Sequence, residues 1–177
     1  MDAAVPRARE APVAWALEDL YRAHAADVAR WAGRLAGPEL DVEDLVHEVF
    51  VVVRPRLADF RGDAPITTWL FRITENVVRR ERRRARWGRW WRSDEGLDFA
   101  DERDDPEVVA ARRQDVARLY RALDRLSERL RTVVILHEIE GLTGPEIAAL
   151  LEVEPNVVWV RLHRAKKKLA RVLEAER

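Results

Sequence analysis

Apolar residues recur every three or four positions along most of this 177-residue chain, as they do in helices with one buried face. Apolar and polar residues nowhere alternate as they do in strands, so the pattern predicts an all-α protein. Helices are expected over residues 17–35, 41–54, 66–86 and 108–126, then between a Ser127 cap and Gly141, and finally as a pair within residues 143–169.

The last pair of predicted helices has the layout of a helix-turn-helix. Thr143 and Glu146 stand three positions apart before an apolar run, which predicts a capping box, and Pro155 sets the start of the second helix. One narrow stripe of that second helix is apolar: Val158, Leu162, Ala165, Leu169 and Val172. Its opposite face is basic, which is typical of a DNA-binding helix; a helical hairpin with a solvated basic face is the alternative.

Charge divides the chain into segments, although its 32 basic and 32 acidic residues cancel. Residues 72–92 contain nine arginines and two glutamates, whereas residues 93–107 contain eight acids and one arginine. The acidic stretch has no apolar period, which predicts a flexible linker between two small helical domains. We therefore expect a disordered lead-in (1–14), a first domain (15–92), the acidic linker (93–107) and a helix-turn-helix domain (108–177).

The helix predicted at 41–54 carries its acids on one face. Asp41, Asp44 and Glu48 cluster there with His47 beside them, and no Lys or Arg interrupts them. Clustered carboxylates without a counter-ion repel one another. The pattern indicates either a solvated face that gains from the helix dipole or a surface for a basic partner.

The helix predicted at 66–86 carries a basic stripe beside its apolar one. The stripe follows a spacing of three or four positions: Trp69, Arg72, Asn76, Arg79 and Arg83. Arginines interleaved with an aromatic and an amide suit phosphate contacts together with base contact or stacking. The alternative is that Trp69 belongs to the core and that the arginines form a solvated helix end.

Three tryptophans follow that helix within five residues, at Trp87, Trp90 and Trp91. Indole rings are costly to leave in water. We expect at least two of them to pack on the helix bundle or on a partner rather than to stack on bases.

Composition and motifs exclude several classes of function. The chain contains no cysteine, which excludes a disulfide framework, a zinc–thiolate site and a thiol nucleophile. Its apolar runs fall far short of the roughly 20 residues that span a membrane, and it begins without a secretory signal, so we expect a soluble, cytoplasmic protein. The two His-Glu pairs do not extend to H-E-x-x-H, and no phosphate-binding loop or G-x-S-x-G elbow is present. No enzyme activity, metal, cofactor or small-molecule substrate is therefore expected.

Four stretches stand in order along the chain: DVEDLVHEVF (41–50), FRGDAPITTWLFRITENVVRRERRR (60–84), LSERLRTVVILHEIEGLTGPEIAALL (126–151) and VVWVRLHRAKKKL (157–169). In order and spacing they resemble the extracytoplasmic-function (ECF) sigma factors, the small promoter-recognition subunits of bacterial RNA polymerase. The D-x-E-D-L-V-x-E-x-F run upstream of T-W-L-x-R-I-x-x-N is the most specific part. The resemblance implies a protein that binds core polymerase, recognises and melts promoter DNA and initiates transcription.

The resemblance also implies roles for individual residues. Core polymerase would be bound by Asp41, Asp44, Leu45, His47, Glu48 and Phe50. The −10 element, as a single strand, would be bound by Phe60, Arg61, Thr68, Trp69, Arg72, Asn76, Arg79 and Arg83. The −35 element, as a duplex, would be bound by Trp159, Val160, Arg161, His163, Arg164, Lys167 and Lys168. The acidic linker would thread through the basic cleft of the polymerase, and an anti-sigma factor would hold the protein inactive.

The chain departs from the family pattern mainly in its helix-turn-helix. The family usually has Gln at His47, Gly at Glu152 and Asn156, Thr at Val157 and Ser or a basic residue at Val160. A non-glycine residue at Glu152 costs about 1 kcal/mol if the left-handed conformation is kept. Trp159 and Val160 offer apolar surface, which favours a thymine methyl over a guanine edge. Two alternatives stay open: a free-standing helix-turn-helix regulator, and a sigma-like decoy or adaptor that binds only polymerase or an anti-sigma factor.

Overall fold

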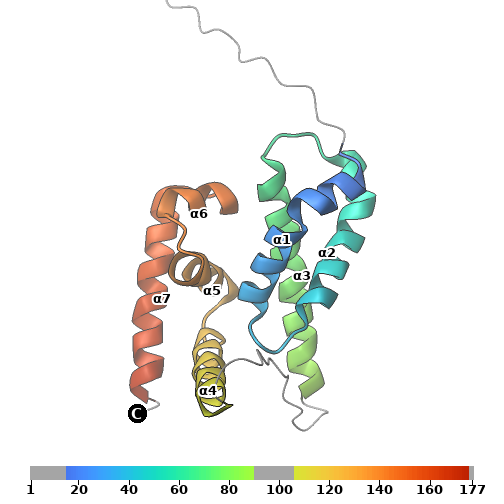
Figure 1. Cartoon of the computed structure of the whole chain (residues 1–177). Coiled ribbons are helices and arrows are strands. Elements are labelled where there is room, and N and C mark those ends of the chain that lie inside the picture. The colour runs from blue at the N-terminus through green and yellow to red at the C-terminus, as the bar shows by residue number, and fades with distance from the viewer. Residues whose placement is uncertain (1–14, 90–105, 176–177) are drawn as a thin grey trace, which may run out of the picture.

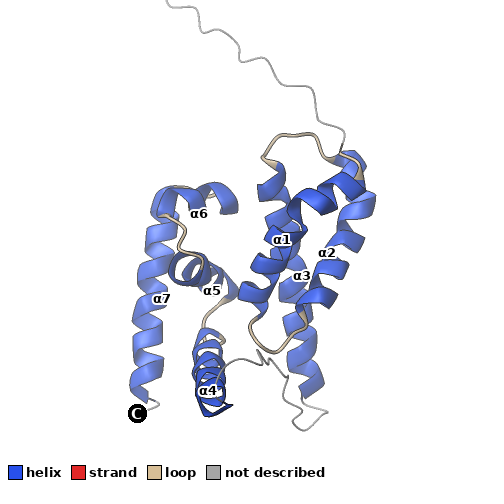
Figure 2. Ribbon diagram, in the orientation of Figure 1, coloured by secondary structure: helices blue, strands red, loops and turns tan. Residues whose placement is uncertain are grey.

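The computed structural model describes residues 15–89 and 106–175, and these are helical with no strand (Figure 2). The N-terminal half contains α1 (Leu17–Ala36), α2 (Val42–Arg56), the 3-10 turn η1 (Leu57–Asp59) and α3 (Ile66–Arg89). The C-terminal half contains α4 (Pro106–Leu123), α5 (Glu128–Val134), the π-helical turn η2 (Ile135–Ile139), α6 (Gly144–Leu151) and α7 (Pro155–Ala175). The all-α prediction is confirmed, and the two helical domains lie side by side (Figure 1).

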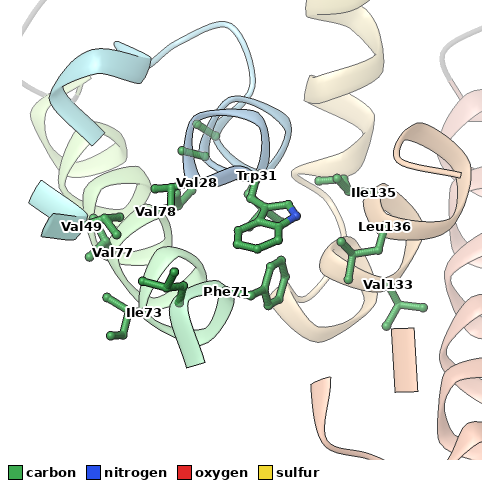
Figure 3. Close-up of a cluster of buried hydrophobic side chains, with 14 of the residues drawn as sticks. Val28, Trp31, Val49, Phe71, Ile73, Val77, Val78, Val133, Ile135 and Leu136 are labelled. Atoms are coloured by element: carbon green, nitrogen blue, oxygen red, sulfur yellow. The ribbon is translucent and has the colours of Figure 1, made fainter. Parts of the chain in front are cut away.

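The N-terminal domain packs α1, α2 and α3 around their apolar stripes. Val28, Val49 and Val77 from the three helices are buried together (Figure 3). Asp41 caps α2 as predicted, since its carboxylate accepts the N–H groups of Glu43 at 2.8 Å and of Asp44 at 3.0 Å.

The end of α2 differs from the prediction, because the helix continues through Pro55 to Arg56. A proline lacks its own N–H bond and its ring crowds the carbonyl four residues earlier, so the helix can include Pro55 only in its last turn and ends one residue later. The chain then passes through η1 into the loop expected over residues 60–65, and α3 begins at Ile66 as predicted.

The C-terminal domain begins earlier and is less regular than predicted. α4 starts at Pro106, within the expected linker, and ends at Leu123 rather than at Leu126. The single helix expected after Ser127 is instead the short α5 followed by η2, and Gly141 takes a left-handed φ of 72° just beyond it. The lead-in (1–14) and nearly all of the acidic linker lie outside the described residues.

The predicted capping box at the start of α6 is confirmed. The Thr143 hydroxyl accepts the Glu146 N–H at 3.4 Å, and the Glu146 carboxylate accepts the Thr143 N–H at 2.7 Å. The additional hydrogen bond from the Thr143 hydroxyl lowers the pKa of Glu146. These bonds fix the entry angle of α6, the first helix of the helix-turn-helix.

One apolar cluster continues from the first domain into the second. The rings of Trp31 and Phe71 meet edge to face, 5.4 Å apart, and face Ile135 and Leu136 of η2 (Figure 3). The sequence had predicted two domains on a linker, but the pattern within each helix does not show that they pack on one another.

Candidate nucleic-acid and polymerase interface

The acidic face of α2 is exposed, but its carboxylates have different environments. Asp41, Asp44 and His47 are exposed, and one oxygen of Asp41 is engaged in the helix cap. Glu48 accepts a hydrogen bond from Arg80 of α3 at 2.8 Å, so it already has an internal counter-ion. Asp44 is therefore the acid on this face best placed to meet a basic partner.

Two residues predicted to contact core polymerase lie inside the N-terminal domain. Leu45 is buried, and Phe50 is only 8% exposed, with its ring 4.7 Å from that of Tyr21. Their side chains hold α2 against α1 and α3. In this structure they position the acidic face rather than form part of the accessible surface.

The predicted −10 surface consists of an exposed stripe on α3 with an aromatic pair at its start. Arg72, Asn76, Arg79 and Arg83 are exposed, as is Arg61 in the preceding loop. Trp69 is half-buried against the core, with its ring 5.2 Å from that of Phe60. Thr68 is buried, so its side chain does not reach this surface.

Arg72 also contacts the second domain. Its guanidinium donates to the carboxylate of Glu152, the residue that ends α6. Glu152 has φ 52° and ψ 50°, the left-handed conformation that its position in the turn predicted. One residue of the predicted −10 surface thus pairs with the turn of the helix-turn-helix.

The predicted −35 surface lies on α7, whose apolar stripe is buried at Val158, Leu162 and Ala165. On the outer face, the exposed residues are Trp159, Val160, His163, Arg164, Lys167 and Lys168, while Arg161 is partly covered. The structure therefore brings all the predicted residues of this surface onto one helix.

Trp159 is only half exposed because its indole covers the start of α6. The ring lies where a Cβ at Gly144 would be, and meets His137 edge to face at 5.9 Å. His137 is itself held by a 3.0 Å hydrogen bond between Nδ1 and the Leu142 carbonyl. Only the outer part of the indole is available to a ligand.

Sequence reasoning missed a group of charged residues between the two domains. Arg82 of α3 is only 6% exposed and pairs with Asp124 and with Glu128, the latter at 2.9 Å. Arg131 of α5 donates to the Leu35 carbonyl at the end of α1, and burial lowers its pKa to about 10. The sequence contained one signal for this interface: Arg131 lies on a helix face that it shares with apolar residues, which indicates a buried and paired arginine.

Two further contacts extend this interface. Tyr120 donates to the Arg34 carbonyl at 2.9 Å, and burial raises the pKa of this phenol. Its ring lies against Gly37, whose φ of 81° and lack of a Cβ allow the close approach. Glu140 pairs with Arg30 at 3.1 Å and with Arg34 at 3.2 Å.

Two other kinds of site are absent from the described residues. No group of three His, Asp or Glu side chains in residues 15–89 and 106–175 could hold a metal ion. Within the same ranges no helix is both long and apolar enough to cross a membrane. The notable surfaces are thus one acidic helix face and two basic ones.

Comparison with known proteins gives consistent matches over both domains. The family model "Sigma-70 region 2" matches residues 20–88, and "Sigma-70, region 4" matches residues 117–169. RNA polymerase sigma factor CnrH of Cupriavidus metallidurans is 33% identical over 168 residues, covering 91% of this chain and 88% of the relative. The ECF RNA polymerase sigma-E factor of Escherichia coli strain K12 is 32% identical over 139 residues, covering 73% of this chain and 72% of the relative.

A solved structure is similar over the same length. CnrH in complex with the cytosolic domain of CnrY matches with a TM-score of 0.60 and 31% sequence identity. The match covers 91% of this chain and 89% of that one.

Proposed function

Since the chain belongs to the ECF family of RNA polymerase sigma factors, we propose that its three charged surfaces divide the work of initiation between them. As a sigma factor the protein directs promoter recognition. The exposed acids of α2 dock on core polymerase, the α3 stripe binds and helps melt the −10 element, and α7 binds the −35 duplex. The core enzyme forms the phosphodiester bonds of the RNA, and the protein acts with it in the cytoplasm.

The observation that carries this proposal is the pair of exposed basic faces, one on α3 and one on α7. Each lies within a different matched region of the chain. Two DNA-facing helices in one chain support recognition of a bipartite promoter. A free-standing helix-turn-helix regulator would need only the second face and would usually obtain two of them by dimerising.

The acidic face is tested by charge reversal at Asp44. We expect Asp44→Lys to abolish co-elution with core polymerase, because a cation would then face the basic partner surface. Glu43→Lys is the matched control, since Glu43 is an exposed acid in the same first turn, turned about 100° around α2 away from Asp44. Unchanged co-elution of the Asp44→Lys protein would remove α2 from the polymerase interface.

The function as a whole is tested by run-off transcription on fragmented genomic DNA with core polymerase. Transcripts that start at a shared sequence motif are expected only when the protein is added. Binding to core without any transcript would favour the decoy or adaptor. If the protein binds duplex DNA alone, and adding core polymerase does not change that binding, the free-standing regulator is favoured.

A regulatory partner is also proposed. CnrH, the relative described above, is solved in complex with the cytosolic domain of CnrY. We infer that an anti-sigma factor similarly binds this chain. Such a partner would compete with core polymerase or with DNA for the sigma factor. Adding the purified anti-sigma factor to the run-off reaction should therefore suppress the transcripts.

A further inference from the structure

We propose that Trp87, together with Arg79 and Arg83, binds the DNA duplex immediately upstream of the −10 element. This surface extends the α3 stripe toward the helix C-terminus. The inference rests on the proposed role of α3 in promoter binding.

Trp87 has no packing role that would explain its size. Its side chain is 76% exposed, the most of any large apolar residue in the described ranges. The C-terminal end of α3 extends past the ends of α1 and α2, which leaves this turn outside the three-helix bundle (Figure 1). At least two of the three tryptophans were expected to pack on the bundle or on a partner. Trp87 does not pack on the bundle, and Trp90 and Trp91 lie outside the described residues, so this expectation stays a prediction.

Trp87 continues the α3 stripe in register. Residues four apart on a helix lie on one face, so Arg79, Arg83 and Trp87 follow one another along it. At about 1.5 Å per residue, Trp87 lies about 6 Å beyond Arg83 and about 22 Å beyond Arg72. With about 3.4 Å per base pair, these spans correspond to about two and six base pairs.

From Arg79 to Arg86, the arginines of α3 divide by face into those with and those without carboxylate partners. On the side toward α2, Arg80 pairs with Glu48 at 2.8 Å and Arg84 pairs with Glu81 at 3.2 Å. On the side toward the second domain, Arg82 and Arg86 pair with Glu128 at 2.9 Å and 3.4 Å.

Between these flanks Arg79 and Arg83 lack an internal anion, whereas Arg72, near the start of the stripe, pairs with Glu152 of the second domain. Arg79 donates to the neutral amide of Asn76, and Arg83 has no carboxylate within 4 Å in the described part of the chain. If the helix were basic only to be soluble, its arginines would not need to separate into a paired and an unpaired face. Unneutralised guanidiniums in a row that ends in an exposed indole match a phosphate backbone with a sugar or base surface beside it.

The direction of the chain places this end of α3 upstream. Along the chain, the C-terminus of α3 precedes the second domain, whose α7 is proposed to bind the −35 element, and that element lies upstream of −10. The N-terminal part of the stripe, with Trp69 and Phe60, then meets the melted strand. Trp87 meets the first base pairs that remain paired.

Photocrosslinking in the complete initiation complex tests this placement. A benzophenone side chain replaces Trp87, or Arg83 as the positive control, in holoenzyme bound to a promoter found by run-off transcription. We expect crosslinks from position 87 to DNA about two base pairs upstream of those from position 83. Crosslinks from position 87 to a polymerase subunit, or no DNA crosslink from it when position 83 gives one, would overturn the proposal. If the wild-type protein starts no transcript, the proposed function fails and this inference with it.

A binding measurement supplies a second, independent test. Trp87→Ala should weaken holoenzyme binding to the full promoter about tenfold, and Trp87→Phe should retain most of the affinity, as for loss and replacement of one aromatic contact to nucleic acid. On a template that ends at the −10 element, wild type and Trp87→Ala should bind equally because the proposed ligand is missing. An equal loss on both templates would overturn the proposal.

Discussion

At the scale of single residues, Glu152 combines an unfavourable backbone with a favourable contact. Its φ of 52° lies in the left-handed region, which costs a non-glycine residue about 1 kcal/mol. Its carboxylate pairs with Arg72, and because both side chains are substantially exposed the pair contributes about 1 kcal/mol at most. The two effects are of similar size, so the side chain is tolerated where the family usually has glycine.

Substitution at Glu152 separates these two effects. Glu152→Ala keeps the strained conformation and loses the ion pair, whereas Glu152→Gly loses both. The glycine variant should therefore exceed the alanine variant by about 1 kcal/mol in free energy of unfolding, measured by urea denaturation. Glu154 serves as control, since its φ is not positive and glycine there should bring no gain. Equal stabilities of the two Glu152 variants would show that the turn relaxes.

At the scale of elements, α7 carries both a residue expected to contact bases, Arg164, and a residue expected to contact phosphates, Lys167. We expect Arg164→Ala to cost about 1–3 kcal/mol of promoter affinity and to relax the preference at one −35 position. Lys167→Ala should weaken binding to all sequences alike, with a smaller dependence on salt. Affinities for a set of −35 variants measure both effects. Equal losses on every promoter for both variants would contradict direct base contact by Arg164.

How much of these elements the sequence predicts depends on where the information lies. The stripe of Val158, Leu162 and Ala165 and the cap of α6 are local, and both are found as predicted. The helical spacing of the apolar residues also indicated which faces of α2, α3 and α7 are exposed. Phe50 was assigned to a surface through the family motif, yet it is buried against Tyr21 because α1 covers that side of α2.

The contacts between the domains could not be predicted from local patterns. Arg82 lies in a run of arginines, and nothing in that run distinguishes it from Arg83, which is exposed. Only the position of Glu128, 46 residues later, makes Arg82 a buried, paired residue. Helix period identifies the side of a helix that is covered by its own domain, not a side covered by a second one.

At the scale of the whole molecule, the packed arrangement cannot bind both promoter elements. Elements centred near −10 and −35 are about 25 base pairs apart, or about 85 Å along B-DNA. A compact chain of this length has a radius of gyration of only about 16 Å. The proposed function therefore requires the two domains to separate on the polymerase.

The interface charges should control this separation, and Arg82→Ala tests them. Removing Arg82 leaves Asp124 with only Arg131 at 3.3 Å and Glu128 with only Arg86 at 3.4 Å, at a cost between the about 1 kcal/mol of an exposed pair and the about 3–5 kcal/mol of a buried one. The domains can avoid this cost by moving apart, because both carboxylates then regain water. We therefore expect separation rather than unfolding.

Energy transfer between two dyes measures the separation directly. The chain has no cysteine, so Glu43→Cys on α2 and Lys168→Cys on α7 give two unique, exposed labelling sites. Arg82→Ala should lower the transfer efficiency while helical circular dichroism stays unchanged. Arg84→Ala is the matched control, since among the described residues Arg84 pairs only with Glu81 of its own helix, and its removal should leave the efficiency unaltered. If Arg82→Ala instead keeps the dyes close and lowers the melting temperature in one cooperative step, the two domains unfold as one unit. Opening on the polymerase would then need binding energy from the core enzyme to break the apolar contact of Trp31 and Phe71 with η2.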